Sequence, residues 1–86
     1  MSTEIQLTLI GKPGCHLCDD AQSVIDTVLA EFEDSIVLEK KNILDDDALF
    51  ARYSEEIPVL LINGRVHNYW RIDPVRLRDE LQKLVK

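Results

Sequence analysis

Two cysteines separated by two residues are the part of this sequence best suited to chemistry. Cys15 and Cys18 are its only cysteines. A thiolate rather than a thiol attacks disulfides and binds metals, and an ordinary cysteine is mostly protonated at neutral pH. Two cysteines are too few for the disulfide framework of a small secreted protein. Their spacing therefore indicates either a redox-active dithiol or part of a metal site.

A zinc site within one chain is the less favoured of these two interpretations. A structural zinc ion takes four ligands in a tetrahedral array. Cys15 and Cys18 supply two, and there is no second Cys-x-x-Cys. His16 lies between them, where a third bond to the same ion is hard to form, and His67 is predicted as a partly exposed strand residue. We therefore expect no metal site.

The residues around the two thiols predict a strand followed by a helix. Apolar and polar side chains alternate over residues 5–10, and residues 11–14 contain two glycines and a proline that break the strand. From Leu17 to Phe32, apolar side chains recur at steps of three and four residues, as on one face of an amphipathic helix. Cys15 is thus expected at the helix N-terminus and Cys18 in the first turn.

The start of a helix is a favourable place for a thiolate. Its unsatisfied backbone N–H groups and the positive end of the helix dipole stabilise an anion. Cys15 occupies that place, so it is the candidate nucleophile. Cys18 lies nearly one turn further along the same side. It is expected to be less exposed and to act as the resolving thiol that closes a disulfide with Cys15.

Charged neighbours act on Cys15 in opposite directions. Lys12 and a protonated His16 would stabilise its thiolate, whereas Asp19 and Asp20 would oppose it. The sequence does not rank these effects. His16 has a second interpretation as an exposed loop side chain, and the two aspartates also suit the first turn of a helix.

The rest of the chain predicts five more elements. Three are strands, with a strong hairpin signal at Asn63-Gly64, and two are helices that begin at aspartates. In order they are a strand at 36–38, a helix from 45–47 through about residue 53, strands at 58–62 and 66–71, and a helix from Asp73-Pro74 onward. The first strand–helix–strand unit predicts a parallel pair with a right-handed crossover. We therefore predict one α/β domain over residues 1–86, with a four-stranded mixed sheet flanked by helices in the order βαβαββα.

The strand, the segment from Lys12 through Cys18 and the amphipathic helix together resemble the active site of glutaredoxins and thioredoxins. The order of elements resembles a bare glutaredoxin, without the extra N-terminal strand and helix of thioredoxin. Short bacterial glutaredoxin-like domains look most similar. Ile57-Pro58, at the start of the third strand, resembles the cis-proline of the family. The resemblance covers nearly the whole chain and implies a thioredoxin fold.

This resemblance implies a thiol–disulfide oxidoreductase in which Cys15 and Cys18 are catalytic. It also implies that Pro58 is cis and lies against the Cys15 sulfur, where backbone groups are offered to an extended thiol substrate. Lys12 and the backbone of Val59 match contacts that the family makes with glutathione, which would then be a co-substrate, and no other cofactor is expected. The substrate-binding residues expected around the thiols are Lys12, His16, Leu17, Ile57, Pro58 and Val59.

Several residues depart from the glutaredoxin pattern. Glutaredoxins usually have Pro-Tyr between the cysteines, where this chain has His16-Leu17, and Val before the cis-proline, where it has Ile57, as in thioredoxins. Their Gly-Gly turn and the acidic residue after it hold the glutathione backbone, and residues 68–73 of this chain lack that turn. Arg71 could replace a lost carboxylate contact, and Asp73 has a second interpretation as a helix cap.

Two other functions stay open on sequence alone. The domain could be a non-catalytic module whose cysteines sense redox state or help to bind a partner. It could also carry an iron–sulfur cluster shared between two chains, with glutathione as an extra ligand, as some glutaredoxins do. Strand alternation favours core packing for one of Tyr69 and Trp70, whereas an exposed aromatic side chain near the thiols would indicate a partner surface.

Composition and charge restrict the partners and the location. The 86 residues carry a formal net charge of −6, and the basic residues are scattered. An acidic surface repels nucleic acids and anionic membranes, and no segment approaches the roughly 20 apolar residues that cross a bilayer. The N-terminus lacks the basic start of a signal peptide. We therefore expect a cytoplasmic monomer whose partner is a disulfide-containing protein or glutathione.

Overall fold

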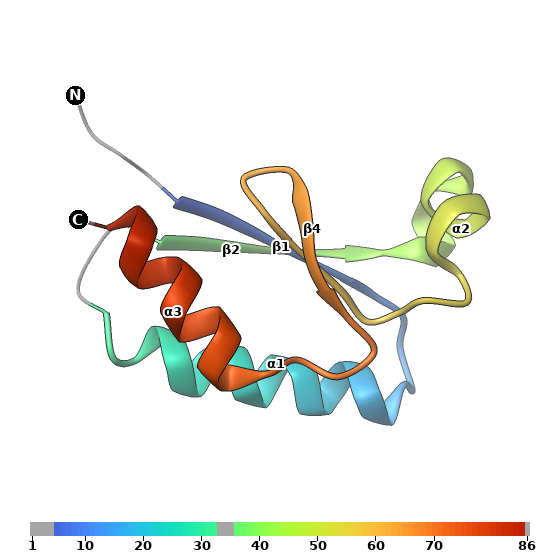
Figure 1. Ribbon diagram of the computed structural model, residues 1–86. Helices are drawn as coiled ribbons and strands as arrows, with labels where there is room; N and C mark the ends of the chain where they lie inside the picture. Colours follow the sequence, from blue (N-terminus) through green and yellow to red (C-terminus); the bar gives the residue numbers. More distant parts are fainter. Residues whose placement is uncertain (1–4, 33–35, 86) are drawn as a thin grey trace.

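The computed structural model describes residues 5–32 and 36–85, which form a four-stranded sheet with three α-helices (Figure 1). In chain order the elements are β1 (Ile5–Gly11), α1 (His16–Leu29), β2 (Ile36–Asn42), a single 3-10 turn (Ile43–Asp45), α2 (Asp47–Tyr53), β3 (Val59–Ile62), β4 (Arg65–Tyr69) and α3 (Pro74–Leu84). The predicted α/β class and the order βαβαββα are confirmed, and the fold is the thioredoxin fold.

The register of the sheet brings the start of β3 next to the segment that carries the thiols. The strand order is β2-β1-β3-β4, with β1 parallel to β2 and antiparallel to β3, so the sheet is mixed as predicted. Ile10 near the end of β1 pairs with Val59 at the start of β3. Pro58, one residue before Val59, therefore lies at the same end of the sheet as the loop that leads to Cys15.

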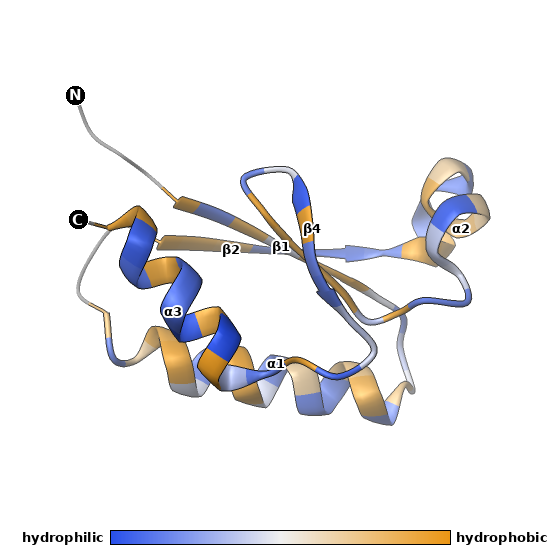
Figure 2. Ribbon diagram, in the orientation of Figure 1, coloured by the Kyte–Doolittle hydropathy of each residue, from blue (hydrophilic) through white to orange (hydrophobic). Residues whose placement is uncertain are grey.

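Strand alternation divides the core into two clusters, one on each face of the sheet. Leu7 of β1 and Leu60 of β3 belong to the larger cluster, which is closed by the apolar faces of α1 and α3. Ile10 and Val59, on the opposite face, pack with Tyr53 of α2. Figures 1 and 2 show α1 and α3 together on one side of the sheet, with hydrophobic residues recurring along both helices. The larger cluster thus holds α1, which begins at Cys15, against the sheet.

Strand β2 is longer than its predicted extent of 36–38. It pairs with β1 from Ile36 to Asn42, including the polar segment Glu39–Lys41. β2 is an outer strand of the sheet, and charged side chains are usual on such strands because one edge faces water. The polar residues beyond the predicted strand are therefore compatible with the longer β2 that the structure has.

The hairpin between β3 and β4 forms where it was predicted, but β4 ends earlier than expected. Asn63 and Gly64 both have positive φ, 51° and 86°, as a two-residue hairpin turn requires. The predicted strand 66–71 is wrong at both ends, because β4 runs from Arg65 to Tyr69. Trp70 leaves the strand with a φ of 66°, which no extended residue can adopt.

Aspartates begin the two shorter helices. The Asp46 carboxylate accepts hydrogen bonds from the N–H groups of Ala48 and Leu49 at the start of α2. The Asp73 carboxylate accepts one from Val75 at 2.9 Å at the start of α3. These three bonds satisfy helix N–H groups that have no partner within the helix.

Asp73→Ala is expected to destabilise the domain by about 1 kcal/mol, because the first turn of α3 loses its acceptor. Asp73→Asn keeps an acceptor at the same place and is expected to cost only a few tenths of a kcal/mol. Urea denaturation of the two variants checks this expectation. Equal loss in both variants would show that charge, not capping, is what Asp73 contributes.

Candidate active site

The thiol segment begins with a turn that only a glycine forms without strain. Gly14 has a φ of 75°, which L side chains rarely adopt, and the chain then enters Cys15 in an extended conformation. Cys15 is the N-cap of α1, and its Sγ accepts a hydrogen bond from the Cys18 N–H at 3.2 Å. The predicted place of Cys15 is confirmed, and its sulfur acts where a capping oxygen usually does.

Cys18 differs sharply from Cys15 in its surroundings. It is 8 % exposed and belongs to the core, whereas Cys15 is half-buried. Burial, reinforced by a side-chain hydrogen bond with Cys15, raises the pKa of Cys18 to about 11, although a backbone hydrogen bond to Lys12 acts in the opposite direction. Both cysteines are free thiols in this structure. At neutral pH Cys18 is therefore protonated and shielded, and Cys15 is the accessible sulfur.

Alkylation is expected to distinguish the two thiols. With a pKa of about 11 instead of 9.0, Cys18 holds roughly 100-fold less thiolate than an ordinary cysteine at pH 8. Iodoacetamide should therefore add one group to the native reduced protein, on Cys15. A second group should appear as the pH rises toward 11, because only then does Cys18 lose its proton, or when the chain is denatured.

Intact-mass time courses at several pH values measure this difference. The Cys15→Ser variant serves as the control, because any adduct on it must be on Cys18. Equal modification rates for the two cysteines at pH 8 would contradict the assigned roles.

Gly11 allows Cys18 to approach the end of β1. A Cβ atom built on Gly11 would lie 2.8 Å from the Cys18 Sγ and 3.3 Å from its Cβ, and the first of these distances is closer than real side chains come. The end of the β1 backbone therefore lies in close contact with the Cys18 thiol. Sequence reasoning treated Gly11 only as a strand breaker.

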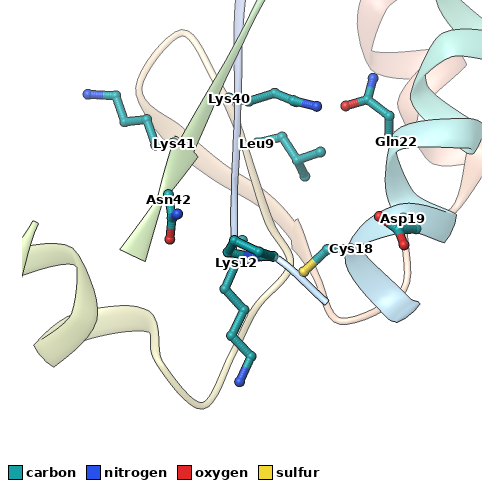
Figure 3. Close-up of a pocket in the computed structure, with 10 residues that line it drawn as sticks. Leu9, Lys12, Cys18, Asp19, Gln22, Lys40, Lys41 and Asn42 are labelled. Atoms are coloured by element: carbon teal, nitrogen blue, oxygen red, sulfur yellow. The ribbon is translucent and has the colours of Figure 1, made fainter. Parts of the chain in front are cut away.

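A cavity of about 310 Å³ opens beside Cys18, between α1 and the ends of β1 and β2. Figure 3 shows Lys40 extending from β2 toward Gln22 on α1, with the Cys18 sulfur below them, while Lys12 extends away from Gln22. Lys12 thus lines the cavity as part of the loop, but its ammonium group is not directed at Cys18. Lys40 was not among the predicted residues, since it lies 22 positions after Cys18 and is placed by the β1–β2 register.

The Ile57-Pro58 peptide bond is cis, as the resemblance implied. The Pro58 side chain is buried, and Val59 is buried within the cluster under α2. Either residue could therefore meet a substrate only through its backbone. Among residues 5–32 and 36–85, neither the N–H nor the carbonyl of Ile57 has a backbone partner, whereas the Pro58 carbonyl accepts a bond from the Trp70 N–H. Ile57 is thus the residue of this segment whose backbone is free to bind.

The two residues between the cysteines lie on the surface of the first helical turn. His16 is exposed, and Leu17 is 38 % exposed. Leu17 lines a second cavity, of about 220 Å³, between α1 and the segment Trp70–Ile72 that leads into α3. The structure therefore brings Leu17 together with residues from the far end of the chain.

Trp70 and Tyr69 are both exposed, by 51 % and 44 %, so the expected core packing of one of them is wrong. The reason is the left-handed conformation of Trp70, which ends the strand alternation and costs roughly 1–2 kcal/mol for a residue with a side chain. The rings of Tyr69 and Trp70 stand edge to face, with centroids 4.9 Å apart. Trp70, one residue of this exposed aromatic pair, borders the cavity beside Leu17.

Comparison with known proteins decides the family. Residues 6–82, nearly the whole chain, match the family described as glutaredoxin-like domain (DUF836). The chain belongs to this family. A mycobacterial relative from Mycobacterium tuberculosis, itself uncharacterized, is 29 % identical over 85 residues, which cover 91 % of this chain and 84 % of the relative.

Solved structures agree with this glutaredoxin-like domain. A structural genomics target from X. campestris is 32 % identical, with a TM-score of 0.72 over 90 % of this chain and 96 % of the other. A Nitrosomonas europaea protein, 21 % identical, has a TM-score of 0.77 over 93 % and 94 % of the two chains. Chloroplastic thioredoxin z, at 9 % identity and a TM-score of 0.75 over 95 % and 79 %, shares the fold.

The glutaredoxin-like domain differs from glutaredoxins where the Gly-Gly turn is missing. Asp73 follows the position where glutaredoxins have that turn. Its carboxylate caps the N-terminus of α3, and its own N–H donates a hydrogen bond to the Asn68 side chain. The interpretation of Asp73 as a helix cap is thus correct. Arg71 is exposed and borders the cavity beside Leu17.

Within residues 5–32 and 36–85 no three His, Cys, Asp or Glu side chains gather as metal ligands would. His67 lies in β4, where burial lowers its pKa. An iron–sulfur cluster is held by four ligands, of which this chain offers the two thiols, so further ligands would have to come from other molecules. In the same residue ranges, no helix combines the length and the apolar composition that crossing a bilayer takes.

Proposed function

We propose that this glutaredoxin-like domain is a thiol–disulfide oxidoreductase in which Cys15 is the nucleophile and Cys18 the resolving thiol. The observation that carries the proposal is the asymmetry of the two sulfurs. Cys15 is partly exposed at the N-cap of α1, where its sulfur accepts a hydrogen bond from the Cys18 N–H. Cys18 is buried one turn below with its proton retained.

The proposed reaction has two exchange steps. The Cys15 thiolate attacks one sulfur of a substrate disulfide, forming a mixed disulfide and releasing the first substrate sulfur as a thiolate that takes a proton from water. Cys18 then loses its proton and attacks the Cys15 sulfur, releasing the second substrate thiol. The substrate gains two electrons and two protons, and the domain is left with a Cys15–Cys18 disulfide, which an external dithiol or two molecules of glutathione reduce.

The free backbone of Ile57 supports an extended substrate. Its N–H and carbonyl lie next to the cis-Pro58 and have no backbone partner among the described residues. A strand-like segment beside a substrate cysteine could pair with them, as an added strand does at a sheet edge. We accordingly propose a disulfide-containing protein or glutathione as the substrate. We also propose that the enzyme is a monomer and that it works in the reducing cytoplasm, where a dithiol pair stays reduced.

A redox titration of the purified protein in glutathione buffers tests the proposal. Intact mass is read after acid quenching at each ratio of oxidised to reduced glutathione. We expect a reversible loss of two hydrogens at a defined poise, and its midpoint separates a reductant from an oxidant. Cys18→Ser is the matched control, because it should stop at a single glutathione adduct on Cys15.

The outcomes separate the oxidoreductase from the non-catalytic module that the sequence left open. A glutathione adduct on wild-type Cys15 that precedes the disulfide favours glutathione as co-substrate despite the missing Gly-Gly turn. A protein that shows neither species at any poise would overturn the oxidoreductase proposal and leave a module that binds partners without turnover.

A further inference from the structure

Trp70 connects the cis-proline segment to the cavity beside Leu17. Its backbone N–H donates to the Pro58 carbonyl at 2.8 Å, and its indole N–H donates to the Glu55 carbonyl at 3.2 Å. Two bonds from one residue thus hold the segment that contains Ile57 and Pro58. The same residue lines the cavity that Leu17 borders from α1.

The backbone conformation of Trp70 is not the one that a tryptophan prefers by itself. Its φ of 66° is one that glycine adopts freely and a bulky residue does not. Residues held in such conformations persist where their surroundings fix them, and they cluster at binding and catalytic sites. Here the fixing contacts are the two hydrogen bonds and the edge-to-face contact with Tyr69.

The side chain is held in place but not covered. Half of the Trp70 surface is exposed, as is part of Leu17. Between them the cavity of about 220 Å³ is lined by the apolar side chains of Ala21, Val24 and Ile72 and bordered by Asp20 and Arg71. An exposed aromatic residue at the border of an apolar hollow suits one side chain of a polypeptide. The Ile57 backbone, in the segment that Trp70 holds, suits the main chain of the same polypeptide.

We infer that Trp70 is a positioning and specificity residue that makes the site select disulfides within polypeptides over small-molecule disulfides. The inference rests on the proposed oxidoreductase function. Trp70 fixes the backbone of residues 55–58, to which the substrate main chain binds, and presents its ring to the substrate side chain next to the reacting cysteine. A small disulfide reaches Cys15 without either contact.

Steady-state kinetics with two substrates test this inference, using dithiothreitol as the reductant. Insulin supplies a polypeptide disulfide, and bis(2-hydroxyethyl) disulfide supplies a small one, whose unactivated alkyl leaving thiol makes its direct reaction with dithiothreitol slow. Trp70→Gly relieves the backbone strain and removes the ring, so KM for insulin is expected to rise about tenfold with kcat within twofold. Rates with the small disulfide should stay unchanged.

Two further variants test the indole hydrogen bond separately from the ring and provide a control outside the cavity. Trp70→Phe keeps an aromatic ring and loses the bond to Glu55, so it is expected to raise KM for insulin by about threefold, between wild type and Trp70→Gly. Val66→Ala removes an exposed apolar side chain from β4 outside this cavity and should change neither substrate. Thermal melts confirm that all variants fold.

The results distinguish this inference from the function on which it rests. A parallel loss with both substrates, or an unchanged KM for insulin in Trp70→Gly, would overturn the role of Trp70 while leaving the oxidoreductase intact. A wild-type protein that reduces neither disulfide would overturn the proposed function, and the specificity inference with it.

Discussion

Cys15→Ser is expected to lower disulfide reduction to the background rate of the external dithiol, because Cys18, the other cysteine of the chain, is buried. Cys18 cannot replace it, since its burial raises its pKa to about 11 and keeps it protonated. The measurement is the initial rate of insulin reduction. Activity that persists in Cys15→Ser would refute the assigned nucleophile.

The Cys18→Ser variant completes this experiment. It retains the nucleophile, so it should still attack a disulfide once, but it has no thiol to release the mixed disulfide. A covalent complex between Cys15 and one half of the substrate is therefore expected to accumulate, visible as a single adduct by intact mass. Full turnover in this variant would show that an external thiol resolves the complex.

Gly11→Ala is expected to destabilise the domain by about 1–3 kcal/mol, the usual cost of forcing an extra methyl into a packed core. The added Cβ would lie 2.8 Å from the Cys18 Sγ, so the thiol or the strand must move. Without that contact the change would be mildly favourable, since alanine restricts the unfolded chain. The displaced Cys18 should also resolve mixed disulfides more slowly.

A double-mutant cycle with Cys18→Ala isolates this contact. Once the Sγ is removed, the nearest atom to the new methyl is the Cys18 Cβ at 3.3 Å, and Gly11→Ala should then cost much less. Chemical denaturation of the four proteins gives the coupling energy. Additive effects would mean that the destabilisation arises elsewhere in the β1 backbone.

Local signals in the sequence were sufficient for most of the fold. Asn63-Gly64 specified the hairpin because both residues tolerate positive φ, and Asp73-Pro74 specified a helix start because the carboxylate caps it. The place of Cys15 followed from the same reasoning, since a broken strand and an apolar helical face fixed the junction between them.

The parts that sequence reasoning missed depend on contacts between distant segments. Lys40 reaches the cavity beside Cys18 through the β1–β2 register, on a strand that was predicted only over residues 36–38. Trp70 leaves β4 because acceptors at Glu55 and Pro58 hold it. A glycine at position 11, directly before the thiol loop, was a signal for close approach that could have been used.

The start of α1 differs from those of α2 and α3 in a way that links electron transfer to backbone order. Asp46 and Asp73 keep their carboxylates whatever the redox state, but the acceptor at the start of α1 is the Cys15 sulfur. In a disulfide that sulfur is neutral and only a weak acceptor. In the proposed reaction, each oxidation would therefore weaken the cap of α1 alone. A partner could then distinguish the oxidised from the reduced protein by the order of the first turn of α1.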